Sequence, residues 1–94
     1  MKLAWTERSR RDLADIERFI ARDDPDVARR WVARLRLRAR RAAAAPRSGR
    51  VVPEIGRTDV REVLLAGYRI VYLVGEDAVI VLTVLESHRL LPIG

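Results

Sequence analysis

The sequence predicts an α+β fold with the element order β-α-α-β-β-β, in which a helical hairpin packs on one face of a small, mainly antiparallel sheet. Two observations carry this prediction. The first half of the chain holds two amphipathic helical patterns, and the second half holds three short apolar runs separated by turns that contain glycine. The length of 94 residues favours one domain, 1–94, with a single modest core.

A strand at residues 2–5 and a helix over residues 7–22 open the chain. Thr6 lies between them, and its hydroxyl can accept a hydrogen bond from an amide of the first helical turn that has no partner within the helix. The pattern of the helix is amphipathic, and its apolar face holds Leu13, Ile16, Phe19 and Ile20.

A second helix, from Pro25 to about Ala45, follows after a short break. Asp24 is the expected N-cap, and Pro25 takes the first helical position, where its missing N–H costs nothing. Because the break is so short, the two helices must form an antiparallel hairpin. Trp31 lies at the centre of the apolar half of this helix, so we expect it to pack between the hairpin and the sheet. Leu37 lies alone among the charged residues.

The positive charge of the chain is concentrated in its middle. The net charge is +6, and residues 29–50 contain nine arginines and no acid. Guanidinium groups suit carboxylates and phosphates, so the arginine face of the second helix either binds an acidic partner or is simply solvated. No aromatic residues interleave with these arginines, so a base-stacking platform is not indicated. Direct binding of nucleic acid is not expected outside a complex with another protein.

Three strands of an antiparallel meander make up the second half of the chain. They cover residues 60–66, 68–74 and 78–85, with Gly67 in the first turn and Gly75 in the second. Both faces of these strands read as apolar, which is typical of strands that are covered on both sides. The chain is too small to cover both faces itself, so we expect a partner protein to cover the second one.

Two arginines, Arg61 and Arg69, interrupt the apolar strands. Burying an arginine without a partner is costly, so each is either an edge residue that snorkels to water or part of a polar site within a partner-binding surface. The residues expected to bind a partner are Arg61, Leu65, Arg69, Val71, Leu73 and Arg89.

The residue types offer little for catalysis or metal binding. His88 is the only histidine and the chain has no cysteine, so no metal site of the ordinary kind is available, and no cofactor is expected. One hypothesis joins Glu54, Arg69 and His88 into an acid–base set for cleaving RNA. Such a set needs a base for the ribose 2′-OH, a cation for the phosphate and an acid for the leaving oxygen.

The compartment is predicted from composition. The lack of cysteine suits a reducing cytosol, and no stretch is long and uncharged enough for a signal peptide or a membrane span. We therefore expect a cytoplasmic protein that does not insert into membranes.

Eight segments, in their order and spacing, connect the chain to a known superfamily. They are Trp5-Thr6, Asp12-Leu13-Ala14-Asp15-Ile16, Asp23-Asp24-Pro25-Asp26-Val27-Ala28, Pro46-Arg47-Ser48-Gly49-Arg50, Pro53-Glu54, Arg61-Glu62, Tyr68-Arg69-Ile70-Val71-Tyr72 and Val84-Leu85-Glu86-Ser87-His88-Arg89. With these segments the chain resembles toxins of the RelE/ParE superfamily, and the ParE branch more closely. The resemblance implies the toxin of a type II toxin–antitoxin pair. A cognate ParD-like antitoxin would neutralise it by laying its C-terminal segment over the apolar sheet face.

The resemblance implies one of two modes of action. ParE-like toxins inhibit DNA gyrase by binding, whereas RelE-like relatives are ribosome-dependent endoribonucleases that cleave mRNA. Residues 57–61 lack the lysine cluster typical of RelE, and no tyrosine follows His88. Many ParE-like chains carry histidine at the position of Glu86, so His88 is offset and inherits no role. These departures favour a gyrase inhibitor that is not an enzyme, and a binding domain without toxicity is the third alternative.

Overall fold

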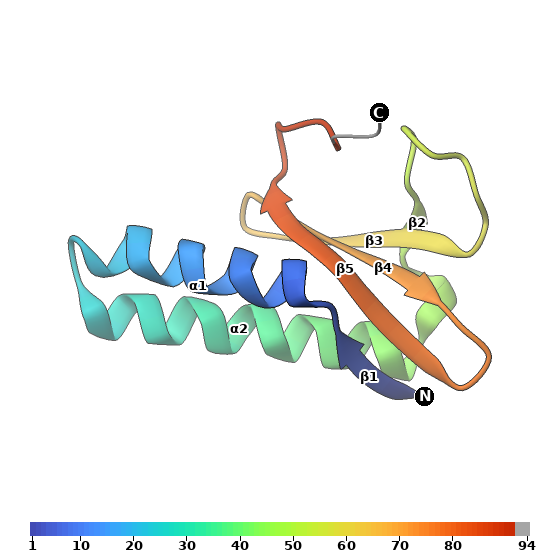
Figure 1. Cartoon of the computed structure of the whole chain (residues 1–94), viewed down its shortest axis with the longest axis horizontal. Helices are drawn as coiled ribbons and strands as arrows, with labels where there is room; N and C mark the ends of the chain where they lie inside the picture. The colour runs from blue at the N-terminus through green and yellow to red at the C-terminus, as the bar shows by residue number, and fades with distance from the viewer. Residues whose placement is uncertain (92–94) are drawn as a thin grey trace.

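A five-stranded sheet with two helices on one face forms the body of the computed structural model (Figure 1), which describes residues 1–91. The elements in chain order are β1 (Lys2–Trp5), α1 (Glu7–Ala21), α2 (Pro25–Ala44), the 3₁₀ turn η1 (Pro46–Ser48), β2 (Arg50–Val51), β3 (Val60–Leu65), β4 (Tyr68–Val74) and β5 (Ala78–Glu86). The strand order is β1-β5-β4-β3-β2, with β1 parallel to β5 and all other neighbours antiparallel. The predicted α+β fold is confirmed, and the two-residue β2 is an addition to it.

Side chains cap the first turn of both helices. The hydroxyl of Thr6 accepts from the N–H of Ser9 at 3.1 Å. The carboxylate of Asp24 accepts from the N–H groups of Asp26 and Val27 at 2.9 and 3.2 Å. These bonds satisfy amides that have no partner within the helix, and both predicted caps are confirmed.

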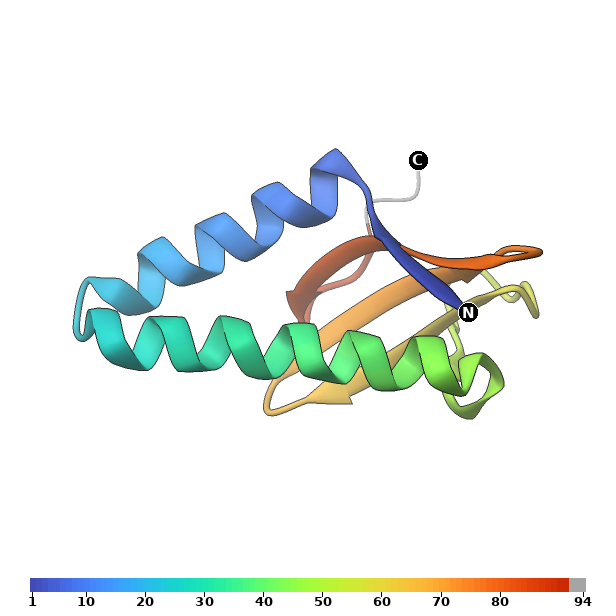
Figure 2. The ribbon, with the colours of Figure 1, turned by 90° about the horizontal axis from the view of Figure 1, so that it is seen from below.

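The helical hairpin reaches beyond the edge of the sheet. α1 and α2 lie close together at the turn that joins them and spread apart toward the strands (Figure 2). The sheet packs against the open end of the hairpin, and the main core forms there. Its buried members are Leu13, Leu35, Ala39, Ala42, Ala43, Val63, Ile70, Tyr72, Val79, Val81 and Val84.

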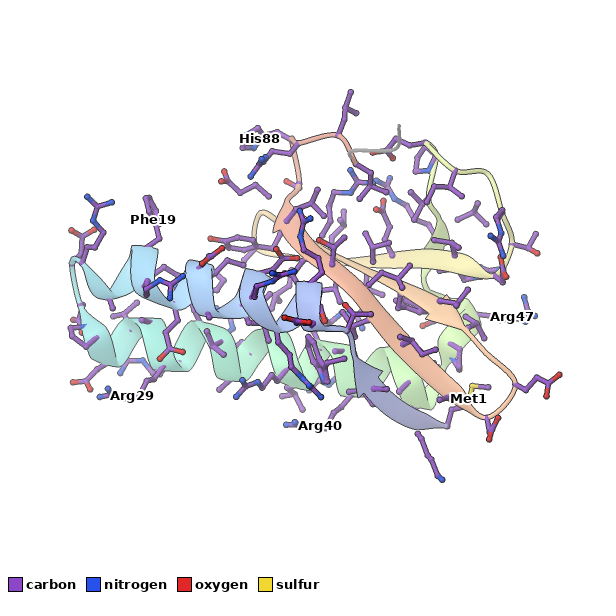
Figure 3. All side chains as sticks on the ribbon, in the orientation of Figure 1. Met1, Phe19, Arg29, Arg40, Arg47 and His88 are labelled. Atoms are coloured by element: carbon purple, nitrogen blue, oxygen red, sulfur yellow. The ribbon has the colours of Figure 1, made fainter. Side chains whose placement is uncertain are left out.

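Two aromatic side chains of the hairpin lie outside the buried core, contrary to the sequence prediction. Phe19 is 66% exposed, because it belongs to the part of α1 that overhangs the sheet (Figure 3). Trp31 is only half-buried: its ring meets the Tyr68 ring edge-on at 6.3 Å, and the guanidinium of Arg34 lies 4.7 Å from its centre. The buried face of α2 is a narrower stripe made largely of alanines, which leaves Trp31 on its flank.

The centre of the second face of the sheet is covered by the chain itself. A loop at residues 52–59 and the segment after β5, here called the tail (residues 87–91), contribute to a small apolar cluster. Its buried members are Val52, Val60, Val71 and Leu91. The loop turns back sharply because Gly56 adopts a positive φ of 72° and donates to the Val52 carbonyl at 2.9 Å. Val71 is 1% exposed, so the expectation of a bare apolar face is wrong for its centre.

Candidate functional site

A buried ion cluster lies on the second face of the sheet. Arg69 on β4 is 3% exposed, and its Nε donates to Glu62 Oε1 at 2.7 Å. Its two terminal nitrogens donate to the two carboxylate oxygens of Glu54, each at 2.8 Å. Glu62 on β3 is 1% exposed and also accepts from the guanidinium of Arg50 on β2. The buried charges are tolerated because each one is paired and hydrogen-bonded.

This cluster fastens the tail to the sheet. The guanidinium of Arg69 also donates to the Arg89 carbonyl at 2.8 Å, and the Glu54 carboxylate accepts from the Leu91 N–H at 3.1 Å. The bond from Arg69, with a smaller contribution from the Leu91 N–H, lowers the pKa of Glu54 from 4.5 to about 2. The bond to Glu54 in turn raises the pKa of Arg69 above its ordinary value. Both groups therefore stay charged at neutral pH.

A cleft of about 310 Å³ lies beside the tail, between α1 and β5. β1 pairs with β5 only as far as Val81, so the rest of this edge of β5 faces α1 instead of a strand. The carboxylate of Asp12 accepts from the Val84 N–H at 3.0 Å and satisfies part of that edge. Phe19 and Leu90 line the cleft and are 66% and 78% exposed, the highest values among the large apolar side chains of residues 1–91.

Comparisons with known proteins place this geometry in a family. Residues 3–91 match the family described as the ParE toxin of the type II toxin–antitoxin system, parDE. The chain belongs to this family. A curated protein of Sinorhizobium fredii, named "Putative toxin Y4kP", is 39% identical over 94 residues, which cover 97% of this chain and 93% of that protein. A solved structure titled "Chromosomal ParDE TA system from P. aeruginosa" shares the fold with a TM-score of 0.76 and 19% identity, covering 92% of this chain and 95% of its own. The expected resemblance to ParE-like toxins is confirmed.

The RNA-cleaving set suggested by the sequence is not assembled in this ParE-like toxin. Glu54 and Arg69 do meet, but they bond to each other, and Arg69 is too buried to reach a phosphate. His88 lies on the turn after β5 (Figure 3), forms no hydrogen bond with either of them, and has a side chain that is 75% exposed. Its Nε2 is 3.6 Å from the carboxylate of Glu86. The geometry of Glu54 and Arg69 holds the tail in place.

Two of the residues expected to bind a partner point toward the helices of the toxin. In the sheet register Arg61 lies opposite Tyr72 and Leu65 lies opposite Tyr68, which places both on the helix-covered face. Leu65 packs against the main core. The guanidinium of Arg61 donates to the Gly49 carbonyl at 2.9 Å, so this charge already has an acceptor within the chain.

The other four lie on or near the second face. Arg69 and Val71 are buried by the loop and the tail, Leu73 is half-buried, and Arg89 is exposed. The exposed Leu90 was not among the residues predicted from the sequence. A large apolar residue directly after the polar run at residues 86–89 was the available signal for it.

Within residues 1–91 no helix is long and apolar enough to cross a bilayer. In the same part of the chain, no three His, Asp or Glu side chains gather as a metal-binding group would require.

Proposed function

We propose that this ParE-like toxin inhibits DNA gyrase by binding it, without catalysis, and that a ParD-like antitoxin neutralises it. The observation that carries the proposal is that the guanidinium of Arg69 is buried and already bonded within the chain. A ribonuclease needs a cation that reaches the phosphate and a base whose pKa lies near neutrality. Here the cation is 3% exposed and bonded to two carboxylates, and a pKa of about 2 makes Glu54 a poor base.

The cleft beside the tail supports a protein target. Phe19 and Leu90 expose apolar area there, and exposed apolar patches often mark protein interaction sites. In protein interfaces a few such anchors carry most of the affinity. We assign the gyrase contact to this cleft. The description of the family as one half of a parDE pair supports the antitoxin.

The test measures DNA supercoiling by purified gyrase in the presence of the toxin. Phe19→Ser and Leu90→Ser should each raise the concentration needed for half inhibition by roughly 30-fold, which corresponds to the loss of an anchor worth about 2 kcal/mol. Neither side chain belongs to the buried core, so both variants should melt like the wild type. His88→Ala is the matched control, because His88 is equally exposed but lies outside the cleft, and it should remain fully inhibitory.

Point variants test the proposal more clearly than removal of the tail does. Deleting the tail would take Leu91 off the second face and remove the Arg89 carbonyl from Arg69, so lost activity would be confused with lost structure. Primer extension on mRNA from translating ribosomes is run in parallel. Discrete cleavage of mRNA with unchanged supercoiling would overturn the proposal in favour of a RelE-like ribonuclease. If neither activity responds, the chain is a binding domain without toxicity.

A further inference from the structure

The outer side of α2 carries exposed arginines that have no acid beside them. Residues 29–41 contain seven arginines and no acid, and six of the seven are exposed. Within residues 1–91, only Arg29 of these seven forms an ion pair, with Asp26. By contrast, the strand arginines Arg61 and Arg69 are already bonded within the chain. α2 therefore presents a concentrated positive charge to the solvent.

The arginines of α2 lie on two sides of Leu37. On the side toward β3 there is a groove of about 240 Å³ that is lined by Arg34, Leu37, Arg38, Arg41 and Leu65. On the other side Arg29, Arg36 and Arg40 follow the helical spacing i, i+7, i+11 and share one row, here called the basic stripe. Figure 3 shows Arg29 and Arg40 on the side of α2 that faces away from the sheet and the tail. The basic stripe is therefore open to a ligand on the outside of the molecule.

The basic stripe offers charge without an apolar anchor. Ala33 completes its row and adds only a methyl group. An interface with a protein draws most of its affinity from a few large anchors, and a single-stranded nucleic acid needs aromatic faces on which its bases stack. Duplex DNA, in contrast, meets proteins chiefly through its phosphates, and guanidinium groups bind these well. The side chains of the stripe therefore favour duplex DNA as the ligand.

The dimensions of the basic stripe suit a phosphate backbone. From Arg29 to Arg40 the helix rises by about 16.5 Å, at 1.5 Å per residue. A duplex presents one negative charge per roughly 1.7 Å of its axis, which gives about ten phosphates over this length. The long arginine side chains can therefore reach phosphates without a fixed register, and the binding should not depend on the base sequence.

We propose that the basic stripe contacts the phosphate backbone of the duplex DNA that gyrase holds. The inference rests on the proposed function, because gyrase brings the DNA to the toxin. Phe19, which lines the cleft assigned to gyrase, lies on the opposite side of the molecule from Arg29 and Arg40 (Figure 3). The toxin can therefore touch the enzyme with one side and the DNA with the other.

The stripe acts on DNA mainly when the toxin is already seated on gyrase. Sequence-independent binding to a duplex has a Kd of about 10⁻⁴ to 10⁻⁶ M at physiological salt, so the free toxin holds DNA only weakly. On gyrase the neighbouring DNA acts at an effective concentration on the order of 1 mM. The ratio of this concentration to the weakest of these constants is about 10. Contact with the DNA should therefore strengthen the binding of the toxin to gyrase by about 10-fold.

The first arm of the test measures the affinity of the purified chain for a duplex of arbitrary sequence by fluorescence anisotropy. The measurement is repeated at several KCl concentrations below physiological salt. In Arg36→Gln/Arg40→Gln the slope of log affinity against log salt should shrink by about 2, because each lost phosphate contact removes about 0.9. Arg57→Glu is the matched control: it lowers the net charge by the same amount, but Arg57 lies in the loop at residues 52–59, on the second face of the sheet. Its slope should change by less than about 0.5.

All three substituted side chains are exposed, so both variants should melt like the wild type. The basic stripe carries no stacking face, so a single strand of the same length should bind no more tightly than the duplex.

The second arm measures binding of the toxin to purified gyrase with and without the duplex. The affinity of the wild type and of Arg57→Glu should rise by about 10-fold when the duplex is added. Arg36→Gln/Arg40→Gln should bind DNA-free gyrase as the wild type does, and its affinity should rise by less than about 3-fold on addition of the duplex.

Four outcomes would overturn the proposal. A salt slope that Arg36→Gln/Arg40→Gln leaves unchanged would show that the stripe does not touch phosphates, and equal changes in this variant and in Arg57→Glu would reduce the effect to general electrostatics. Tighter binding of the single strand would point to the bases. Weaker binding of Arg36→Gln/Arg40→Gln to DNA-free gyrase would assign the stripe to an acidic protein surface. If the wild type does not bind gyrase at all, the proposed function fails, while the first arm still decides whether the stripe binds duplex phosphates.

Discussion

The two faces of the sheet are closed by different physical means. On the helix-covered face, two helices bury an apolar core in which Leu35 and Ile70 are fully buried. The second face holds a cluster of four buried apolar side chains together with an ion cluster of an arginine and two glutamates, and a loop and the tail serve as the cover. The same strand, β4, supplies both: Ile70 points to one side, and Arg69 and Val71 point to the other.

This difference sets what each face can tolerate. An apolar core loses transfer free energy and gains a cavity when a side chain is shortened, and the loss grows with the volume removed. An ion cluster instead depends on completeness, because a missing partner leaves a buried charge unpaired. Shortening a side chain on the helix-covered face should therefore lower the stability in proportion to the volume removed. Removing one member of the ion cluster on the second face should lower the stability steeply.

The largest effect is expected at the ion cluster. Arg69→Met keeps most of the side-chain volume but leaves Glu62, 1% exposed, without the cation that binds it from β4. The free energy of unfolding should fall by about 3–5 kcal/mol, measured by urea denaturation.

A second variant separates lost charge pairing from lost packing. In Arg69→Met/Glu62→Leu the orphaned charge is also removed, and most of the stability should return, because apolar replacement of a buried ion pair is often neutral or stabilising. Arg50, which also binds Glu62, is more than half exposed and can be solvated instead. A double variant no more stable than Arg69→Met would show that the cluster does not work through charge compensation.

The helix-covered face should show the next largest effect. Leu35→Ala removes a fully buried side chain from the centre of the core and should cost about 2–5 kcal/mol. Leu37→Ala, two residues along the same helix and 42% exposed, is the matched control and should cost less than about 1 kcal/mol. The losses of unfolding free energy in the two variants are compared from their urea midpoints, with the same slope of free energy against urea concentration. Similar losses in the two variants would contradict the observed burial of α2.

The helix-covered face could be predicted from sequence because its signals are local. Helical periodicity, the Thr6 and Asp24 caps and the Asp23-Asp24-Pro25 break depend on neighbouring residues, and each is found where it was expected. The prediction of burial fails for Trp31, which lies on the flank of the narrow buried stripe of α2, and for Phe19. Phe19 has the correct period for the core, yet it lies on the part of α1 that extends past the sheet (Figure 3).

The second face and the candidate sites could not be predicted in the same way. Arg69 bonds to Glu54, fifteen residues earlier, and to the Arg89 carbonyl, twenty residues later, and no local pattern encodes either contact. The apolar run of β4 indicated correctly that both faces are covered, but it carries no information on whether a partner or the chain's own tail supplies the cover. Leu37 was seen as an isolated leucine among charges, and only the placement of Leu65 beside it makes a groove.

The smallest effect is a pH dependence confined to the second face. The folded-state pKa of Glu54 is about 2, below the ordinary value of 4.5, chiefly because of the hydrogen bond from Arg69. The unfolded chain therefore binds a proton at Glu54 at a higher pH than the folded chain does. The stability that this group contributes is fully present above a pH of about 4.5 and is lost as the pH falls toward about 2.

Urea midpoints of the wild type and of Glu54→Gln, measured from neutral pH down to about pH 2.5, should differ most at neutral pH and converge on acidification. Asp59→Asn is the matched control, because Asp59 lies in the same loop and its pKa is also lowered, by Arg57, but in an exposed ion pair that has little to contribute. A difference between the wild type and Glu54→Gln that stays constant over this range would mean that Glu54 holds the tail by shape and not by its charge.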